Sequence, residues 1–294
     1  MKLSILTATY NRGKNLYKLY ESIVKNMIEE LDIEWLIMDD GSKDNTEEIV
    51  KRFALVDKLT IKYFKQENQG KMQAINNLMQ YVTGEVVMDC DSDDYFVVNA
   101  FKNIYEKVPN LLNDNSLYGI VFLKNENENK LSGNFFLKEN ETTTMFDLYF
   151  KQGTLGEKII VFKTEIRKTY KHELIDGEKF ITEARMYHKM DEKYGIKCYN
   201  LVIVEGEYLE DGYTNNIIIS FKKYPKGYFE YFKEILDKNV KNIKLDKRLY
   251  AIKHLILFKV LCGYKNIKLK NKLNQVLYYL LLLPGTIVTK IKFK

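Results

Sequence analysis

The first hundred residues of the chain alternate short apolar segments with amphipathic ones, and this alternation constrains the fold more than any other feature. Four apolar segments have the length of buried strands: 2–8, 33–38, 59–64 and 85–88. Between them, hydrophobic residues recur at helical spacing, as at Leu16, Leu19 and Ile23. Strands and helices that alternate in this way predict right-handed crossovers and a mostly parallel sheet covered by helices. We therefore expect an α/β fold.

Polar residues follow three of these predicted strands, at the edge where sheets of this kind bind ligands. The first strand runs into residues 9–12 (TYNR), the second into 39–42 (DDGS) and the fourth into 89–94 (DCDSDD). Carboxylates as close together as those of the last segment raise one another's pKa unless a cation lies beside them. They predict a site for Mg²⁺ or Mn²⁺, held by one or two carboxylates and by substrate phosphates. The alternative is an acidic turn in solvent.

Two basic residues lie on loops that are expected at the same edge of the sheet. Arg12 follows the first strand, and Lys71 follows Gly70 at the start of the third predicted helix. A carboxylate-bound metal with nearby Lys and Arg side chains would neutralise a diphosphate leaving group. Considered singly, each of the two is more simply an ordinary solvated charge.

Four segments together resemble the glycosyltransferases of family 2, which have the GT-A fold. They are TATYNR, IMDDGSKDNTEEI, NQGKMQAINN and VVMDCDSDDYF, and they follow one another in the order and spacing of that family. The resemblance is strong over residues 1–110 and looser over 150–215. It implies a Rossmann-like mixed, mostly parallel sheet flanked by helices. It also implies transfer of a sugar from a nucleotide-sugar to an acceptor, with inversion at the anomeric carbon and usually with a divalent metal.

The resemblance implies donor-binding roles for residues at three loops. Thr9 and Tyr10 would line the base and ribose of the nucleotide. Asp40 would accept a hydrogen bond from the base, most often uracil. Lys71 would also face the nucleotide, and we place Arg12 with these residues because its loop is shared with Thr9 and Tyr10.

The acidic segment resembles the DXD motif of the family at Asp91-Ser92-Asp93. Asp93 would bind the metal, and Asp91 would lie near the ribose or the metal. Asp94 would face the donor sugar. Asp89 is most simply a residue at the end of its strand.

An inverting transfer needs a carboxylate that takes the proton of the acceptor hydroxyl on the face opposite the leaving phosphate. In the family this residue lies downstream of the DXD motif near the start of a helix, and Glu183 is the best match. The dipole of a helix predicted over 181–194 would favour its ionised form. Other candidates for the base are Glu178, Asp176 and Asp191, although Asp191 is expected too far along the same helix. The alternative for Glu183 is a surface glutamate in the first turn of the helix.

A later segment, YLEDGYT at 208–214, resembles a stretch seen in bacterial members of the family. There Asp211 would lie on the acceptor side of the site. The alternative is an Asp-Gly turn in which Gly212 takes a positive φ.

The net charge of +6 is unevenly distributed, because residues 222–294 hold 18 Lys+Arg and only 4 Asp+Glu. Within this basic region the longest apolar run, 276–288, has 13 residues, whereas about 20 are needed to cross a bilayer. Lysines flank it on both sides, and Tyr278 and Tyr279 suit the headgroup boundary. We expect an interfacial anchor on an anionic membrane, with a helix docked on the protein as the alternative. The high apolar content and the lack of a recognition module argue against nucleic acid.

These features predict two parts. Residues 1–215 would form a GT-A catalytic domain, in which 1–110 binds the nucleotide-sugar and 111–215 supplies the acceptor side and the base. Residues 216–294 would form a basic, apolar helical region. Three scattered cysteines predict neither a disulfide framework nor a zinc site, and favour a cytoplasmic location.

The predicted activity is an inverting hexosyl transfer from a nucleotide-sugar, expected to be UDP-linked, to a glycan or lipid-linked acceptor. Mn²⁺ or Mg²⁺ would be the cofactor, and the product would belong to a surface polysaccharide made at the inner face of the membrane. One alternative is a nucleotide-sugar-binding protein without catalysis on the same fold. A weaker one is a nucleotidyltransferase.

Overall fold

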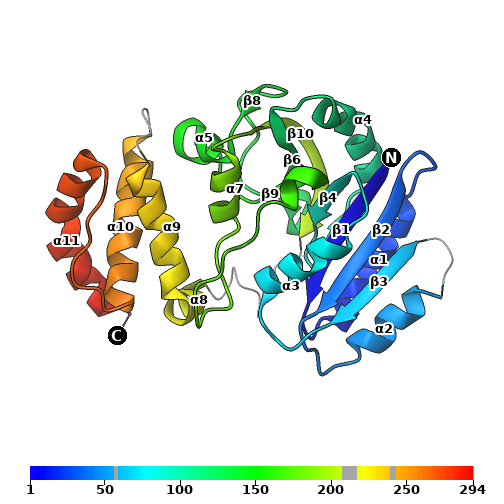
Figure 1. Cartoon of the computed structure of the whole chain (residues 1–294), viewed down its shortest axis with the longest axis horizontal. Coiled ribbons are helices and arrows are strands. Elements are labelled where there is room, and N and C mark those ends of the chain that lie inside the picture. The colour runs from blue at the N-terminus through cyan, green and yellow to red at the C-terminus, as the bar shows by residue number, and fades with distance from the viewer. Residues whose placement is uncertain (56–58, 207–216, 239–242, 294) are drawn as a thin grey trace.

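The computed structural model describes residues 1–55, 59–206, 217–238 and 243–293, and its centre is one ten-stranded sheet (Figure 1). Its strands are β1 (Lys2–Thr9), β2 (Asp32–Asp39), β3 (Thr60–Lys65), β4 (Val86–Asp89), β5 (Asp94–Phe96), β6 (Leu117–Glu126), β7 (Lys130–Leu131), β8 (Thr142–Thr143), β9 (Lys158–Lys163) and β10 (Gly195–Gly206). Their order is β3-β2-β1-β4-β9-β6-β10-β5, with β7 paired to β6 and β8 to β10.

The sheet is parallel in its N-terminal half and mixed beyond it. β1 pairs in parallel with β2 and β4, and β2 pairs in parallel with β3. β9 lies antiparallel between β4 and β6, whereas β10 is parallel to β6. The mixed, mostly parallel sheet that the sequence predicts is therefore confirmed.

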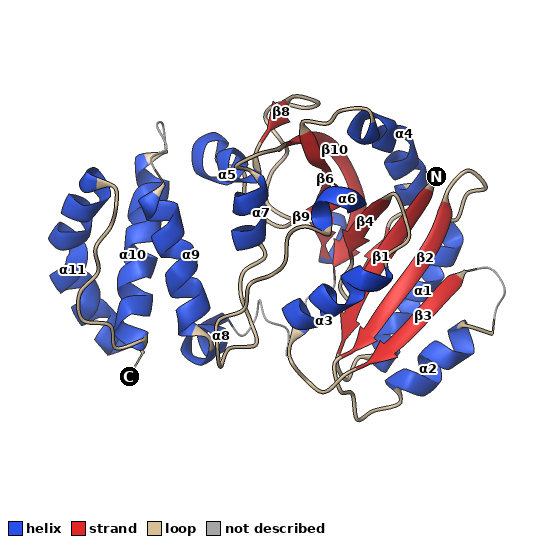
Figure 2. Cartoon of the chain, viewed as in Figure 1, coloured by secondary structure: helices blue, strands red, loops and turns tan. Residues whose placement is uncertain are grey.

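Helices cover both faces of the sheet (Figure 2). One face carries α1 (Gly13–Asn26), α2 (Thr46–Phe53) and α4 (Ala100–Leu112), and the other carries α3 (Lys71–Leu78), α6 (Thr164–Arg167) and α7 (Ala184–Met190). Alternation along β1 produces the two layers, because Ile5 packs with the first group and Leu6 with the second. Short helical turns complete this part at η1 (Met79–Tyr81), η2 (Asn127–Asn129), α5 (Met145–Asp147) and the π-helical η3 (Leu148–Gln152).

The C-terminal helices that the sequence predicts are present, and they form a block with its own apolar core. They are α8 (Ile217–Lys223), α9 (Pro225–Asp237), α10 (Leu245–Leu261) and α11 (Lys272–Lys292). Figure 1 shows α9 and α10 beside α7, with α11 on the far side of α10. Phe232 and Phe258 lie in this core together with Tyr278, which is only 1% exposed. The expectation that Tyr278 lies at a membrane headgroup boundary is therefore wrong, because its ring packs inside the helical block.

Specific polar contacts join the helical block to the part of the chain that precedes it, residues 1–55 and 59–206. The sequence predicts this part to be catalytic, and we call it the catalytic part. The carboxylate of Glu178 accepts hydrogen bonds from the backbone N–H groups of Lys226 (2.8 Å) and Gly227 (2.7 Å), at the start of α9. Arg185 on α7 forms a two-pronged ion pair with Glu234 on α9, with its Nη2 atom 2.7 Å from Oε1. A charged cap and a forked ion pair fix both the position and the direction of α9.

The last helix, α11, has two different faces. Its inner face packs on α10, where Gly285 lies against Ile256. Its outer face exposes a row of apolar side chains at helical spacing: Leu273, Val276, Leu280, Leu283, Ile287 and Ile291. Within the described ranges, no helix is both long enough and apolar enough to cross a membrane.

Candidate active site

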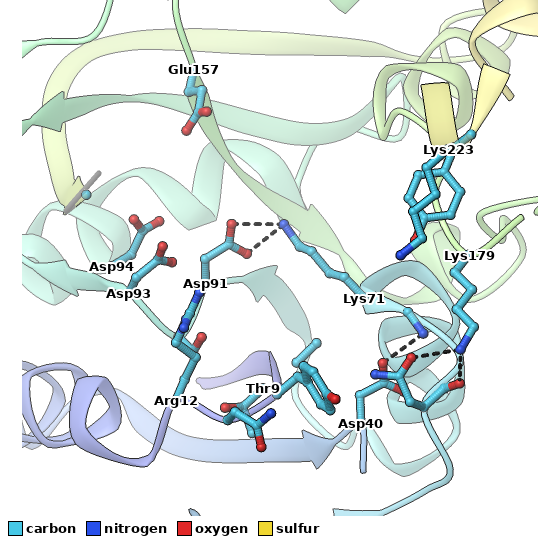
Figure 3. A pocket seen from close by; sticks show the side chains of 18 of the residues that line it. Thr9, Arg12, Asp40, Lys71, Asp91, Asp93, Asp94, Glu157, Lys179 and Lys223 are labelled. Atoms are coloured by element: carbon cyan, nitrogen blue, oxygen red, sulfur yellow. Dashed lines mark hydrogen bonds and ion pairs between the residues drawn. The ribbon is translucent and has the colours of Figure 1, made fainter. Parts of the chain in front are cut away.

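A cavity of about 740 Å³ opens at the carboxyl ends of β1, β2 and β4 (Figure 3). It is lined by the residues that the sequence predicted for donor and metal binding: Thr9, Tyr10, Arg12, Asp40, Lys71, Asp91, Ser92, Asp93 and Asp94. The parallel register explains this convergence, because Thr9 of β1 lies beside Asp39 of β2, and Leu6 of β1 lies beside Asp89 of β4. The three following loops therefore leave the sheet at one edge. We call this space the donor cavity.

Asp40 organises one wall of the donor cavity. Its Oδ1 atom accepts hydrogen bonds from the Gln66 side chain (2.7 Å) and the Gln69 backbone (2.8 Å). Its Oδ2 atom accepts one from the backbone N–H of Gly70 (2.7 Å). Since an ionised carboxylate has about four acceptor positions, the predicted bond from a nucleotide base would use the remaining one at Oδ2.

Gly70 is needed where two loops cross on this wall. Its φ of 93° is rarely adopted by other residues. A Cβ atom at this position would lie 2.2 Å from the carbonyl oxygen of Lys179. The Lys179 ammonium in turn donates to the backbone oxygen of Asn68, at 2.6 Å. The segment that leads to α7 is therefore held against the loop that precedes α3, and α7 begins only at Ala184, later than the sequence predicted.

Thr9 lies at the floor of the cavity with an unused hydrogen-bonding group. Its side chain is buried, and its hydroxyl has no hydrogen-bond partner among the described residues. Its backbone oxygen accepts a bond from the N–H of Asp40, at 2.8 Å. A buried polar atom without a partner destabilises the protein. A ligand that forms a hydrogen bond with the Thr9 hydroxyl would remove this cost.

Lys71 connects the acidic segment to the predicted base. Its Nζ atom lies 2.6 Å from Oδ1 of Asp91 and 2.9 Å from Oε1 of Glu183. The two carboxylates come from different loops, and each is attracted to the same ammonium group. The pKa of Lys71 is raised well above its usual value because these two charges outweigh the effect of burial.

The other carboxylates of the acidic segment have different surroundings. Burial raises the pKa of Asp93, and the neighbouring charge of Asp91 raises it further. Asp94 instead forms a buried ion pair with Lys124, at 2.9 Å, and Lys124 also lies 2.8 Å from Glu157. Figure 3 shows Asp93 and Asp94 side by side. An added positive charge beside Asp93 would therefore stabilise its ionised form.

These residues fit a divalent cation that is held only partly by protein. The described residues contain no group of three His, Cys, Asp or Glu side chains that could hold a metal by themselves. Asp91 and Asp93 offer carboxylate oxygens on one wall of a cavity large enough for a nucleotide. Mg²⁺ is commonly bound in this way, by one or two carboxylates together with substrate phosphates and water.

Glu183 lies immediately before the first residue of α7, at the helix N-terminus. Burial alone would raise the pKa of Glu183, but the ion pair with Lys71 overcomes this and lowers it to about 2. The hydroxyl of Tyr187 also donates to its Oε2 atom, at 3.2 Å. Glu183 does not line the donor cavity; it faces a second cavity on the other side of Lys71, and 34% of its side chain is exposed.

The alternatives to Glu183 are occupied elsewhere or lie away from both cavities. Glu178 caps α9 through two backbone N–H groups. Asp191 accepts bonds from the backbone of Phe146 (2.8 Å) and from the hydroxyl of Tyr118 (3.0 Å), so it holds the start of α5. Asp176 lines neither cavity. Asp211, predicted on the acceptor side, lies outside the described residues.

Sequence reasoning did not find several charged residues of the site. Lys124 and Glu157 come from the end of β6 and the start of β9, far from the acidic segment in the chain. Lys124 could have been found from the sequence, because it directly follows the apolar run LYGIVFL and so lies at the end of a predicted strand. Asp89 is also more than a strand end, because burial raises its pKa to about 6 although Arg167 opposes the rise.

Comparisons with known proteins identify the family. The model of glycosyl transferase family 2 matches residues 4–173, which is more than half of the chain. The chain belongs to glycosyl transferase family 2. The curated relatives include the uncharacterized glycosyltransferase MG060 of Mycoplasma genitalium, which is 41% identical over 113 residues, 36% of this chain and 38% of the relative. A GalNAc(5)-diNAcBac-PP-undecaprenol beta-1,3-glucosyltransferase of Campylobacter jejuni is 30% identical over 186 residues, 62% of this chain and 55% of the relative.

This family 2 chain matches less than two thirds of the length of either relative. Among solved structures, S. aureus TarS 1–349 in complex with UDP-GlcNAc matches with a TM-score of 0.64 and 18% identity, covering 98% of this chain and 89% of TarS 1–349. The mannosyltransferase PcManGT of Pyrobaculum calidifontis, solved with GDP-Man and Mn²⁺, has a TM-score of 0.57 and 13% identity. The match covers 99% of this chain and 86% of PcManGT. These likenesses confirm the GT-A fold predicted from the sequence.

Proposed function

We propose that the protein transfers a sugar from a UDP-sugar to a hydroxyl group of an acceptor, with inversion at the anomeric carbon. The observation that carries the proposal is the double ion pair of Lys71, with Asp91 at 2.6 Å and Glu183 at 2.9 Å. These ion pairs bring a carboxylate of the acidic segment and the proposed base to one ammonium group. An inverting reaction needs the leaving diphosphate and the base on opposite faces of the sugar.

In this proposal the donor cavity holds the nucleotide diphosphate. Asp40 and the unpartnered hydroxyl of Thr9 face the base and ribose, and Tyr10 lies beside them at the cavity rim. Arg12 and Lys71 supply positive charge, and Asp94 faces the sugar. The TarS complex with UDP-GlcNAc supports a UDP-linked donor.

Asp93 and Asp91 would hold the cofactor, Mn²⁺ or Mg²⁺. The Mn²⁺ in the PcManGT complex supports this assignment. When bound, the cation would stabilise the negative charge that develops on the leaving diphosphate.

Glu183 would act as the general base. Its ionised carboxylate takes the proton from the acceptor hydroxyl while the oxygen of that hydroxyl forms a bond to the anomeric carbon. The bond between the anomeric carbon and the diphosphate oxygen breaks at the same time, and its electron pair leaves with the diphosphate. Because Lys71 holds Glu183 in the ionised form, the base is ready to accept a proton before substrates bind.

The test is Glu183→Gln, with Glu192→Gln as the matched control on an exposed glutamate just after α7. Glu183→Gln is expected to keep UDP binding in a thermal-shift assay and to lower kcat by about 10²- to 10⁴-fold, the usual contribution of a general base. Glu192→Gln should leave both unchanged. Nucleotide binding without turnover in the wild-type protein would favour the non-catalytic alternative, and full turnover in Glu183→Gln would place the base elsewhere.

The finer location that we propose is the inner face of a membrane where surface polysaccharides are made, with a glycan or lipid-linked acceptor. The undecaprenol-linked substrate in the name of the C. jejuni relative supports a lipid-linked acceptor. The outer face of α11 supports contact with the bilayer, since it exposes Leu280 and Leu283 (69% and 72%) with Lys290 and Lys292 in its last turn.

A further inference from the structure

A second cavity, of about 880 Å³, adjoins the donor cavity. The two share part of their lining: Lys71, Asp91, Asp94, Lys124 and Glu157. Glu183 lines only the second of them. A molecule in the second cavity would therefore meet the base on one side and the donor sugar across the shared wall.

Aromatic side chains from both parts of the protein line this second cavity. The catalytic part contributes Tyr149, Phe150, Phe180 and Tyr187, and the helical block contributes Tyr228, Tyr231, Phe232 and Tyr250. Polar groups are interspersed, since Asp246 and Lys247 of α10 line the same space. Flat apolar rings that carry hydroxyl groups suit a ligand that is apolar on its faces and polar at its edges.

The helical wall of this cavity is fixed in place. Lys238, just after α9, donates to the backbone oxygen of His188 on α7, at 3.0 Å. The backbone N–H of Lys244, just before α10, donates to the backbone oxygen of Phe150, at 3.2 Å. Together with the cap at Glu178 and the ion pair between Arg185 and Glu234, these bonds tie the ends of α9 and α10 to the catalytic part. The cavity is thus a built feature that requires the helical block.

We infer that the second cavity binds the end of a glycan chain as the acceptor, and that α9 and α10 select it. This inference rests on the proposed transfer. Pyranose rings present C–H groups on their faces and hydroxyl groups at their edges, which matches a cavity lined by aromatic rings together with the charged groups of Asp246 and Lys247. A purely apolar polyprenyl chain would leave those two charges buried without partners, at a large desolvation cost.

The experiment is saturation-transfer NMR on the full chain with UDP present. The probes are trisaccharides of glucose and of N-acetylglucosamine, each used free and coupled to a short polyprenyl diphosphate. Tyr250, which is 52% exposed, is changed to Ala and to Phe, with Tyr279→Ala on the outer face of α11 as the control.

If the inference holds, the sugar protons of at least one probe are saturated. Tyr250→Ala should then lower the affinity for that probe at least tenfold. Tyr250→Phe and Tyr279→Ala should stay within threefold of wild type, because the stacking ring remains in each. Saturation of no probe, saturation confined to the isoprenoid protons, or an unchanged signal in Tyr250→Ala would overturn it. UDP-sugar hydrolysis in water, measured in parallel, separates the two claims: its absence counts against the proposed transfer, while glycan binding is scored independently.

Discussion

Lys71 is the residue at which the two halves of the candidate active site meet. Its ammonium group lies between Asp91, which belongs to the acidic segment, and Glu183, which precedes α7. Neither carboxylate is satisfied by Lys71 alone once a diphosphate enters, because the phosphates compete for the same ammonium group. The charge balance of the site therefore depends on the donor and on the cation that accompanies it.

Asp93→Asn tests the cation at the residue scale. The change removes the charge of the carboxylate that burial and Asp91 already disfavour. We expect metal-stimulated transfer and donor hydrolysis to fall by about 10²-fold or more, the scale seen when an electrostatic group of an active site is removed. The melting temperature without ligand should not fall, because the variant removes a carboxylate charge that burial and Asp91 disfavour in the folded protein.

The control for this change is Asp32→Asn, on an exposed aspartate at the opposite end of β2. Activity in this variant should equal that of the wild type. Equal stimulation by Mn²⁺ in Asp93→Asn and in the wild type would contradict the assignment of Asp93.

At the scale of elements, the start of α9 depends on a side chain from the catalytic part. Glu178 precedes α7 in the chain, yet its carboxylate is the group that caps α9. The cap joins a negative charge to the positive end of a helix dipole. The docking of the helical block is thus tied to the same segment that holds Gly70 and leads to Glu183.

Glu178→Gln should weaken this docking. The amide keeps one acceptor but loses the charge, so we expect the free energy of unfolding to fall by about 1 kcal/mol. Urea denaturation followed by circular dichroism measures it. Glu106→Gln, at an exposed glutamate of α4 far from the helical block, serves as the control. A loss in Glu178→Gln no larger than in that control would show that the cap contributes nothing.

The sequence predicted site residues that are close together in the chain, but not contacts between residues that are far apart in it. Asp91 and Asp93 could be found because they lie together at the end of an apolar strand. The pairing of Asp94 with Lys124 could not, because 29 residues lie between them in the chain. They meet because β10 pairs with β6 on one side and with β5 on the other. Asp191 is a further case: it accepts hydrogen bonds at the start of α5, and this role has no signal in the sequence.

At the scale of the whole molecule, the structure shows how the apolar run of α11 is placed. Its apolar run was expected either to lie on a membrane or to dock on the protein. The inner face docks on α10, while the outer face stays exposed and apolar. One helix can dock through one face and keep an exposed apolar face because its apolar residues cover more than one face.

Replacing Leu280 and Leu283 with Glu tests the proposed membrane contact. Each leucine that is buried contributes about 1.5–3 kcal/mol, so partition onto phosphatidylglycerol vesicles should fall at least tenfold. Leu137→Glu, at an exposed leucine of the catalytic part (74%), should not change partition. Sedimentation velocity checks self-association, and a wild-type dimer that the double variant breaks, with no vesicle binding, would assign the face to a second copy instead.

The contact between α10 and α11 has a geometrical consequence. The helix whose side chains line the second cavity is the same helix against which α11 packs. Under the proposals made above, the surface that meets the bilayer and the wall that meets the acceptor would turn as one body. A sugar carried on a membrane-embedded lipid would then approach the base from a fixed direction. The packing of α11 on α10 would set that direction relative to the plane of the membrane.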